Sequence, residues 1–146
     1  VMRAGIIDYS KAYQQAQDYV DKLSIKVGSV RQKLSELSGG NQQKVVIARW
    51  LCKNPDILIF DEPTTGIDVG TKAEIYKLFG EILDQGKGII LISSYLPELI
   101  GLSDRIIVIS NGEIAGEVEK EDFSEEYLLK LAMKNILNRE KVQEAV

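Results

Sequence analysis

The hydrophobic and polar positions of this chain alternate between two patterns, one typical of buried strands and one typical of helices. Continuous apolar runs at residues 57–60, 89–92 and 106–109 have the length of strands that are buried on both faces of a parallel sheet. Helical spacing of apolar residues predicts a helix over about 70–85 and a shorter one over 96–102, between these runs. Strands that alternate with helices in this way predict an α/β fold with a mainly parallel sheet.

The segments on either side of these strands also carry clear local signals. Helical spacing predicts two helices before the first strand, over Tyr9–Leu23 and Asn41–Cys52. After the third strand, Asn111-Gly112 is a two-residue hairpin signal that predicts an antiparallel fourth strand over 114–118. A last helix is expected over 124–137.

Composition removes several classes of function. The chain has 146 residues and a formal net charge of −4, which argues against a broad nucleic-acid-binding face. It contains no histidine, so Ser-His-Asp and Cys-His catalysis and a histidine-based zinc site are excluded. Cys52 is the only cysteine, so no disulfide forms within the chain.

Two neighbouring carboxylates follow the first apolar strand, in the sequence Asp61-Glu62-Pro63. The carboxyl ends of parallel strands are where α/β sheets bind ligands. One carboxylate could hold Mg²⁺ while the other activates a water molecule. An ordinary acidic turn after a strand has the same sequence, so this motif alone leaves both interpretations open.

A glycine pair opens the predicted helix before that strand, in the sequence Leu37–Gln43. Gly39 and Gly40 let the backbone approach an anion closely, and the N–H groups at a helix N-terminus favour a phosphate. Ser38 can add a hydroxyl donor, but it is also a good N-cap. Taken alone, this motif favours simple helix capping.

The two motifs and the spacing between them resemble the ABC ATPase family over nearly the whole chain. Leu37–Gln43 is similar to the signature loop of that family, and Ile57–Pro63 to its Walker B strand. Thr64–Asp68 is similar to the D-loop region. Ile89–Ser94, followed by Ser103-Asp104-Arg105, resembles the switch strand and the segment after it.

Within that family, the sequence resembles the monosaccharide importers of the ribose and galactose type, in which two ATPase domains are fused in one chain. The segments 37–44 and 66–76 carry this likeness, which is to the C-terminal half of the second domain. The resemblance implies one partial ABC ATPase domain over 1–146. Its expected parts are a remnant of the helical subdomain, a core with the signature loop, Walker B strand, D-loop and switch, and a C-terminal helix and tail: residues 1–37, 38–119 and 120–146.

The resemblance implies ATP and Mg²⁺ as cofactors and gives a role to particular residues. Asp61 would hold Mg²⁺ through water, Glu62 would polarise the attacking water, and Asp68 would couple two ATP sites across a domain interface. The signature residues would bind ATP held by the other ATPase domain; they are Ser38, Gly39, Gly40 and Asn41. The first three of these would lie at the γ-phosphate. Asn41 replaces the more general glutamine of the family.

Two departures from the family pattern bear on activity. Ser94 stands where the family has a switch histidine, so Glu62 lacks its usual helper and its site is expected to be slow or silent. No Gly-x-x-x-x-Gly-Lys-Ser/Thr sequence occurs, so the phosphate-binding loop and its strand are absent from the chain. The isolated chain is therefore not expected to hydrolyse ATP.

The expected function is that of an energising component of an ABC sugar importer. The implied partners are a second ATPase domain, membrane permease subunits and, indirectly, a sugar-binding protein; no nucleic acid is implied. The expected location is the cytoplasmic face of the membrane, through the permease. The alternatives are a soluble ABC ATPase without transport and a non-catalytic assembly fragment. For the isolated chain, we expect strands 89–92 and 106–109 either to pair directly or to leave an edge that another copy fills.

Overall fold

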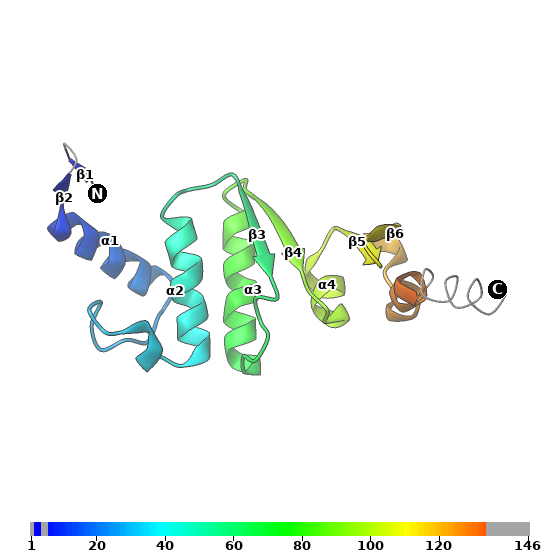
Figure 1. The fold of residues 1–146 in the computed structure, drawn as a ribbon, viewed down its shortest axis with the longest axis horizontal. Helices are drawn as coiled ribbons and strands as arrows, with labels where there is room; N and C mark the ends of the chain where they lie inside the picture. Colours follow the sequence, from blue (N-terminus) through cyan, green and yellow to red (C-terminus); the bar gives the residue numbers. More distant parts are fainter. Residues whose placement is uncertain (1, 4–5, 134–146) are drawn as a thin grey trace. The chain divides into compact units, whose positions relative to one another are not determined.

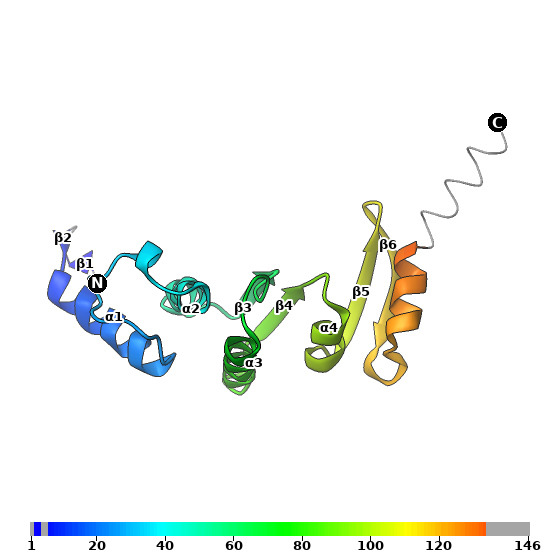
Figure 2. The ribbon, with the colours of Figure 1, turned by 90° about the horizontal axis from the view of Figure 1, so that it is seen from below.

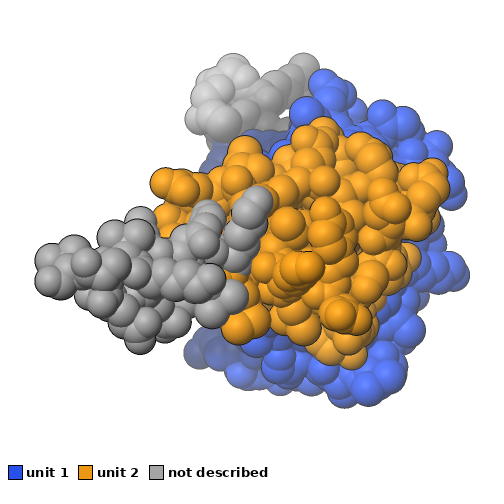
Figure 3. Space-filling model, turned by 90° about the vertical axis from the view of Figure 1, so that its right-hand side faces the viewer, with its two compact units in different colours: residues 1–90 blue, residues 91–146 orange. Residues whose placement is uncertain are grey.

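The computed structural model describes residues 2–3 and 6–133, and these fall into two compact units. The first unit spans residues 1–90 and the second spans residues 91–146, coloured blue and orange in Figure 3. Each unit is described by itself.

Two helices and a two-stranded ribbon form the first part of unit 1. The ribbon pairs β1 (Met2–Arg3) with β2 (Ile6–Ile7) in antiparallel fashion. Helix α1 (Tyr9–Lys22) confirms the first predicted helix, and a single 3₁₀ turn, η1 (Leu34–Glu36), follows it. Helix α2 (Gly39–Leu51) begins two residues before the predicted start. It does so because Ser38 takes the extended backbone of an N-cap and both glycines join the first turn.

A strand–helix–strand unit forms the rest of unit 1. It consists of β3 (Ile57–Asp61), α3 (Val69–Leu83) and β4 (Gly88–Ile92), of which residues 88–90 belong to unit 1. β3 and β4 lie side by side and run in the same direction in Figure 1, so the predicted parallel pairing is present between these two strands. Alternating strands and helices confirm the predicted α/β fold class.

The prediction that the first strand is buried on both faces is wrong. Leu58 and Phe60 are buried, and the Phe60 ring lies 4.6 Å from the Phe79 ring of α3. Ile57 and Ile59 point to the other face and are 61% and 65% exposed. A helix of unit 1 covers only one face of β3, so the apolar run predicted the strand but not its burial.

Unit 2 is a hairpin packed against helices. It contains helix α4 (Leu96–Leu102), strands β5 (Arg105–Ser110) and β6 (Glu113–Glu119), a 3₁₀ turn η2 (Lys120–Asp122), and a helix over 125–133. Figure 2 shows β5 and β6 side by side with the last helix against them. Its buried core joins the hairpin to that helix through Ile106, Val118, Leu128 and Leu131.

The hairpin prediction is confirmed by the backbone of its turn. Asn111 has φ 54° and Gly112 has φ 78°, the pair of left-handed residues that a tight hairpin turn needs. β5 and β6 pair in antiparallel fashion from Arg105–Glu119 to Ser110–Glu113. The predicted last helix begins as expected, but its end lies outside the described residues.

Strand pairing also decides one alternative. In the part of the chain that the structure describes, β4 is hydrogen-bonded to β3 and β5 to β6, in separate sheets. Direct pairing of strands 89–92 and 106–109 is therefore absent among the described strands: β4 pairs with β3 across the helix α3, and β5 pairs with β6 across the tight turn. Filling of an open edge by another copy stays a prediction.

None of the described helices has both the length and the apolar character that crossing a bilayer requires.

Candidate functional site

The predicted signature residues form the exposed first turn of α2. Ser38 is the N-cap, and its carbonyl accepts the first helical hydrogen bond, from Gln42 N–H at 2.9 Å. Ser38 and Gly39 are exposed, and no atom lies within 4 Å of where a Cβ on Gly39 would be. The first N–H groups of a helix have no partner within it. The turn therefore presents backbone donors and a hydroxyl group in open space, which is the arrangement that suits an anion.

Asn41 holds the shape of this turn. Its side-chain nitrogen donates to Ser38 Oγ at 2.8 Å, and its side-chain oxygen accepts from the Lys26 N–H at 2.8 Å. The Gln42 side chain donates to the Leu37 carbonyl at 2.8 Å. The structure thus gives Asn41 a role in orienting the Ser38 hydroxyl and in tying the turn to the segment after α1.

Gly40 brings the turn against α3. It is buried, and a Cβ on it would lie 2.4 Å from Thr71 Cγ2, so any larger residue would have to displace the Thr71 side chain. Thr71 in turn donates to Asp68 twice, from its N–H at 3.0 Å and from its hydroxyl at 2.7 Å. Gly40 and Asp68, predicted as separate site residues, are therefore joined through one threonine.

The Asp68 carboxylate is the N-cap of α3. The hydrogen bond from the Thr71 backbone N–H, followed by that from its hydroxyl, lowers the pKa of Asp68 below its usual value. A carboxylate at a helix N-terminus also faces the positive end of the helix dipole. Asp68 is therefore held ionised and in a fixed orientation on an exposed surface.

The two adjacent carboxylates lie at the end of β3. Asp61 is its last residue, and both Asp61 and Glu62 are exposed. Glu62 has φ 46°, in the left-handed region that costs a non-glycine residue free energy. The Thr65 hydroxyl donates to Glu62 Oε2 at 3.0 Å. A non-glycine residue held in this backbone conformation is typical of functional turns, and it favours the functional interpretation over a plain acidic turn.

The carboxylates can be tested against the implied Mg²⁺. No group of three or more acidic, histidine or cysteine side chains suited to a metal occurs among residues 2–3 and 6–133. Mg²⁺ usually keeps several water ligands and takes one or two carboxylates together with phosphate oxygens. A single exposed carboxylate such as Asp61 fits that mode of binding, whereas a metal site made of protein ligands alone does not fit.

Ser94 belongs to unit 2. It is exposed and lies between β4 and α4, next to Ser93, whose Oγ accepts from the Tyr95 N–H at 3.1 Å. The structure thus groups the signature turn, the carboxylates and Asp68 in unit 1, and it places Ser94 in the other unit.

Three residues of the site escaped the sequence predictions. Thr71 and Thr65 each donate a hydroxyl group to a predicted site carboxylate, and Lys44 reaches α3 from α2. Thr71 had a visible signal, since it stands three residues after Asp68, the spacing at which an N-cap side chain meets the backbone. Lys44 had none, because it reads as one more polar position of an amphipathic helix.

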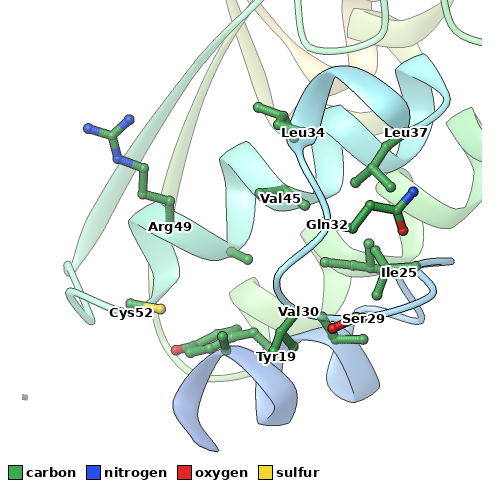
Figure 4. A pocket seen from close by; sticks show the side chains of 14 residues that line it. Tyr19, Ile25, Ser29, Val30, Gln32, Leu34, Leu37, Val45, Arg49 and Cys52 are labelled. Carbon is green, nitrogen blue, oxygen red and sulfur yellow. The ribbon is translucent and has the colours of Figure 1, made fainter. Parts of the chain in front are cut away.

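A cavity of about 240 Å³ lies on the other side of α2, between that helix, α1 and the segment that joins them (Figure 4). Its lining is mostly aliphatic, and the Tyr19 ring and Cys52 lie on its wall. Burial, and then the neighbouring Cys52, raise the pKa of Tyr19. No carboxylate lines the cavity, so it offers no acid–base pair for hydrolysis.

Comparison with known proteins shows which family this chain is similar to. The sequence profile described as ABC transporter matches residues 4–65. The chain is 52% identical over 130 residues to the ribose import ATP-binding protein RbsA 3 of Rubrobacter xylanophilus. It is 48% identical to the xylose import ATP-binding protein XylG of Geobacillus kaustophilus, over 132 residues. These matches cover 89% and 90% of this chain and 26% of each relative, so the chain spans about a quarter of their length.

Solved structures agree with this likeness. A dimeric ATP-binding cassette, MJ0796, bound to ADP and Pi is 27% identical with a TM-score of 0.70, over 83% of this chain and 52% of that one. The ADP conformation of the cassette MJ1267 is 27% identical with a TM-score of 0.65, over 82% of this chain and 45% of that one. The profile match, the sequence matches and the shared fold agree: this chain is similar to the ATP-binding proteins of ABC transporters, and it has part of the fold of an ATP-binding cassette.

Proposed function

We propose that this chain is part of the ATP-hydrolysing component of an ABC importer for a monosaccharide. The exposed turn at Ser38 and Gly39 carries this proposal, because it leaves donors free for a phosphate group. The relatives support the substrate class, since those of about 50% identity are named as ribose, xylose and galactose import proteins.

The signature turn acts on a nucleotide held by a partner ATPase domain. Ser38 Oγ and the N–H groups of Gly39 and Gly40 donate to the γ-phosphate, and Asn41 keeps the Ser38 hydroxyl in place. Fixed donors aimed at charge that develops in the transition state stabilise it more than they stabilise the ground state. Asp68 lies near the same interface and couples the two sites.

The carboxylates belong to the second ATP site. Asp61 would hold Mg²⁺ through water, and Glu62, oriented by Thr65, would polarise the attacking water. Ser94 replaces the longer side chain expected there, so this site turns over slowly. ATP bound with Mg²⁺ supplies the phosphoryl group that is transferred. The chain by itself does not hydrolyse ATP.

The proposed partners follow from this role. They are a second ATPase domain, membrane permease subunits and, through them, a sugar-binding protein. The component would then work at the cytoplasmic face of the membrane.

A non-catalytic assembly role for the isolated chain is a second candidate, favoured by one observation. Ile57, Ile59 and Ile90 are each more than half exposed on neighbouring strands. An apolar surface of this kind typically marks a contact with another protein surface.

Replacement of Ser38 tests the proposed function. In the importer ATPase that carries this sequence, Ser38→Ala should lower ATP turnover and sugar uptake about tenfold or more, the usual effect of removing a transition-state donor. Ser35→Ala is the matched control, because Ser35 is also exposed and lies in the neighbouring 3₁₀ turn. Unchanged turnover and uptake in the Ser38 variant would refute the proposal.

A further inference from the structure

Lys44 is a buried lysine that ties three segments together. It is 4% exposed, and its Nζ lies 2.6 Å from Glu74 Oε2 of α3 and donates to the Ser24 carbonyl after α1 at 3.2 Å. A buried ammonium group is costly unless it is paired and hydrogen-bonded. Its partners are therefore held in place, and with them the relative position of α2 and α3.

A second contact lies one helical turn away on both helices. Gly40 precedes Lys44 by four residues on α2, and Thr71 precedes Glu74 by three on α3, so each pair shares one helix face. Gly40 packs directly on the Thr71 side chain. In Figure 1, α2 and α3 run in the same direction with their first turns at the same end. Two contacts at successive turns prevent α2 from rotating or sliding against α3, whereas one contact alone would allow such movement.

These contacts end at the two functional segments. The first turn of α2 is the signature turn, and the Thr71 hydroxyl donates to Asp68. Movement of α2 against α3 would therefore shift the Ser38 hydroxyl and the Asp68 carboxylate relative to each other.

We propose that Lys44, Glu74 and Thr71 are positioning residues that hold the signature turn and Asp68 as one rigid unit. This rests on the proposed function, in which the turn reaches a phosphate on another domain. A hydrogen-bond donor that must reach a phosphate across an interface has to be held in place by the residues behind it. Misplacement of such a donor by about 1 Å can lower the rate a hundredfold. The contacts of the three residues that carry this proposal are all with other residues of the chain.

The test compares two matched pairs in the importer ATPase that carries this sequence. Glu74→Gln removes the charge that faces Lys44, and Glu81→Gln removes that of the Lys77–Glu81 pair, which is exposed on the same helix. Thr71→Val removes the hydroxyl donor to Asp68 but keeps the side-chain volume, whereas Thr71→Ser keeps the hydroxyl. Turnover, KM for ATP and the unfolding midpoint are measured for each, with assays below the lowest midpoint.

We expect kcat to fall about three- to tenfold in Glu74→Gln and Thr71→Val, with KM for ATP within about twofold of the parent. Glu81→Gln and Thr71→Ser should stay within about twofold of the parent in both parameters. The inference is wrong if kcat per folded molecule is unchanged in the first two variants, or if each variant loses activity only in proportion to its unfolded fraction. If Ser38→Ala is also without effect, the proposed function itself has failed. If Ser38→Ala abolishes turnover while Glu74→Gln and Thr71→Val do not, only the positioning role has failed.

Discussion

The Lys44 ammonium group and the Glu74 carboxylate lie 2.6 Å apart, and they join α2 to α3 from opposite environments. The Lys44 side chain is 5% exposed, whereas that of Glu74 is 54% exposed. The hydrogen bond from Lys44, and then its charge, lower the pKa of Glu74. Water therefore stabilises the Glu74 carboxylate, whereas the protein must stabilise the buried Lys44 ammonium group. For that reason the free energy of unfolding should depend more on Glu74 than on the carboxylate of an exposed ion pair.

Glu74→Gln should therefore reduce stability as well as activity. The change leaves a buried ammonium group facing a neutral amide, and we expect the free energy of unfolding to fall by about 1–2 kcal/mol. Glu81→Gln, in a pair that is exposed on both sides, should change it by less than about 0.5 kcal/mol. Urea unfolding followed by circular dichroism measures both. Equal effects of the two substitutions would contradict this account of Lys44.

The glycine pair should respond unequally to alanine. A methyl group on Gly40 would have to displace Thr71, so Gly40→Ala should lower the free energy of unfolding by about 1–3 kcal/mol. A methyl group on Gly39 meets no atom within 4 Å, so Gly39→Ala should change it by at most about 1 kcal/mol, and upward, since alanine favours the helix. The same unfolding measurement compares the two. A larger loss at Gly39 would show that the close approach to Thr71 does not limit residue 40.

Acid should weaken the cap at Asp68. Its pKa in the folded chain lies below the ordinary value of 3.8, so the stabilisation is fully present above that value and is lost as the pH falls through the folded pKa. Asp68→Asn keeps a capping oxygen but has no charge to lose. The stability difference between parent and variant should therefore be constant near neutral pH and shrink on acidification below about pH 4. Unfolding midpoints measured from pH 7 to strongly acidic pH would show this, and a difference that grows with acid would contradict it.

Neighbouring residues on β3 should behave as opposites. Leu58 is 4% exposed, and Leu58→Ala should lower the free energy of unfolding by about 2–5 kcal/mol. Ile59 is 65% exposed, so Ile59→Thr should cost less than about 1 kcal/mol and reduce self-association of the chain. Light scattering at increasing concentration measures the second effect. If the Ile59 variant associates as strongly as the parent, this face of the sheet is not the contact.

The same strand shows what the sequence could and could not predict. The apolar run at Ile57–Phe60 identified a strand, and local signals such as Asn111-Gly112 identified a turn, because both depend on residues close in sequence. Burial depends on which elements cover the strand, and periodicity carries no such information. The choice of β3 as the partner of β4 was likewise undetermined, since similar apolar runs can pair in more than one order, whereas the pairing of β5 with β6 followed from the turn signal.

In the candidate site, too, some residues could be predicted from the sequence and others could not. The signature and carboxylate segments were identified by short motifs, and the structure gives Ser38 and Gly39 the open position that the motif implies. The contacts of Lys44 with Glu74 and of Gly40 with Thr71 join residues that lie 30 and 31 positions apart in sequence. No motif records such contacts, because their chemistry is that of ordinary helix residues and only the packing of α2 on α3 brings them together.

In the proposed mechanism, ATP turnover should depend more on the signature turn at Ser38 than on the carboxylate site at Glu62. In that mechanism Ser38 would act at the faster of the two ATP sites, whereas Glu62 would belong to the site where Ser94 stands at the position expected for a histidine. In the proposed importer ATPase, Glu62→Gln should therefore lower turnover by less than about threefold, against about tenfold or more for Ser38→Ala. Steady-state phosphate release measures both, and single-turnover measurements at limiting ATP would separate the two sites. If Glu62→Gln abolishes turnover, the site at Asp61 and Glu62 is the active one, and the role of Ser94 must be assigned anew.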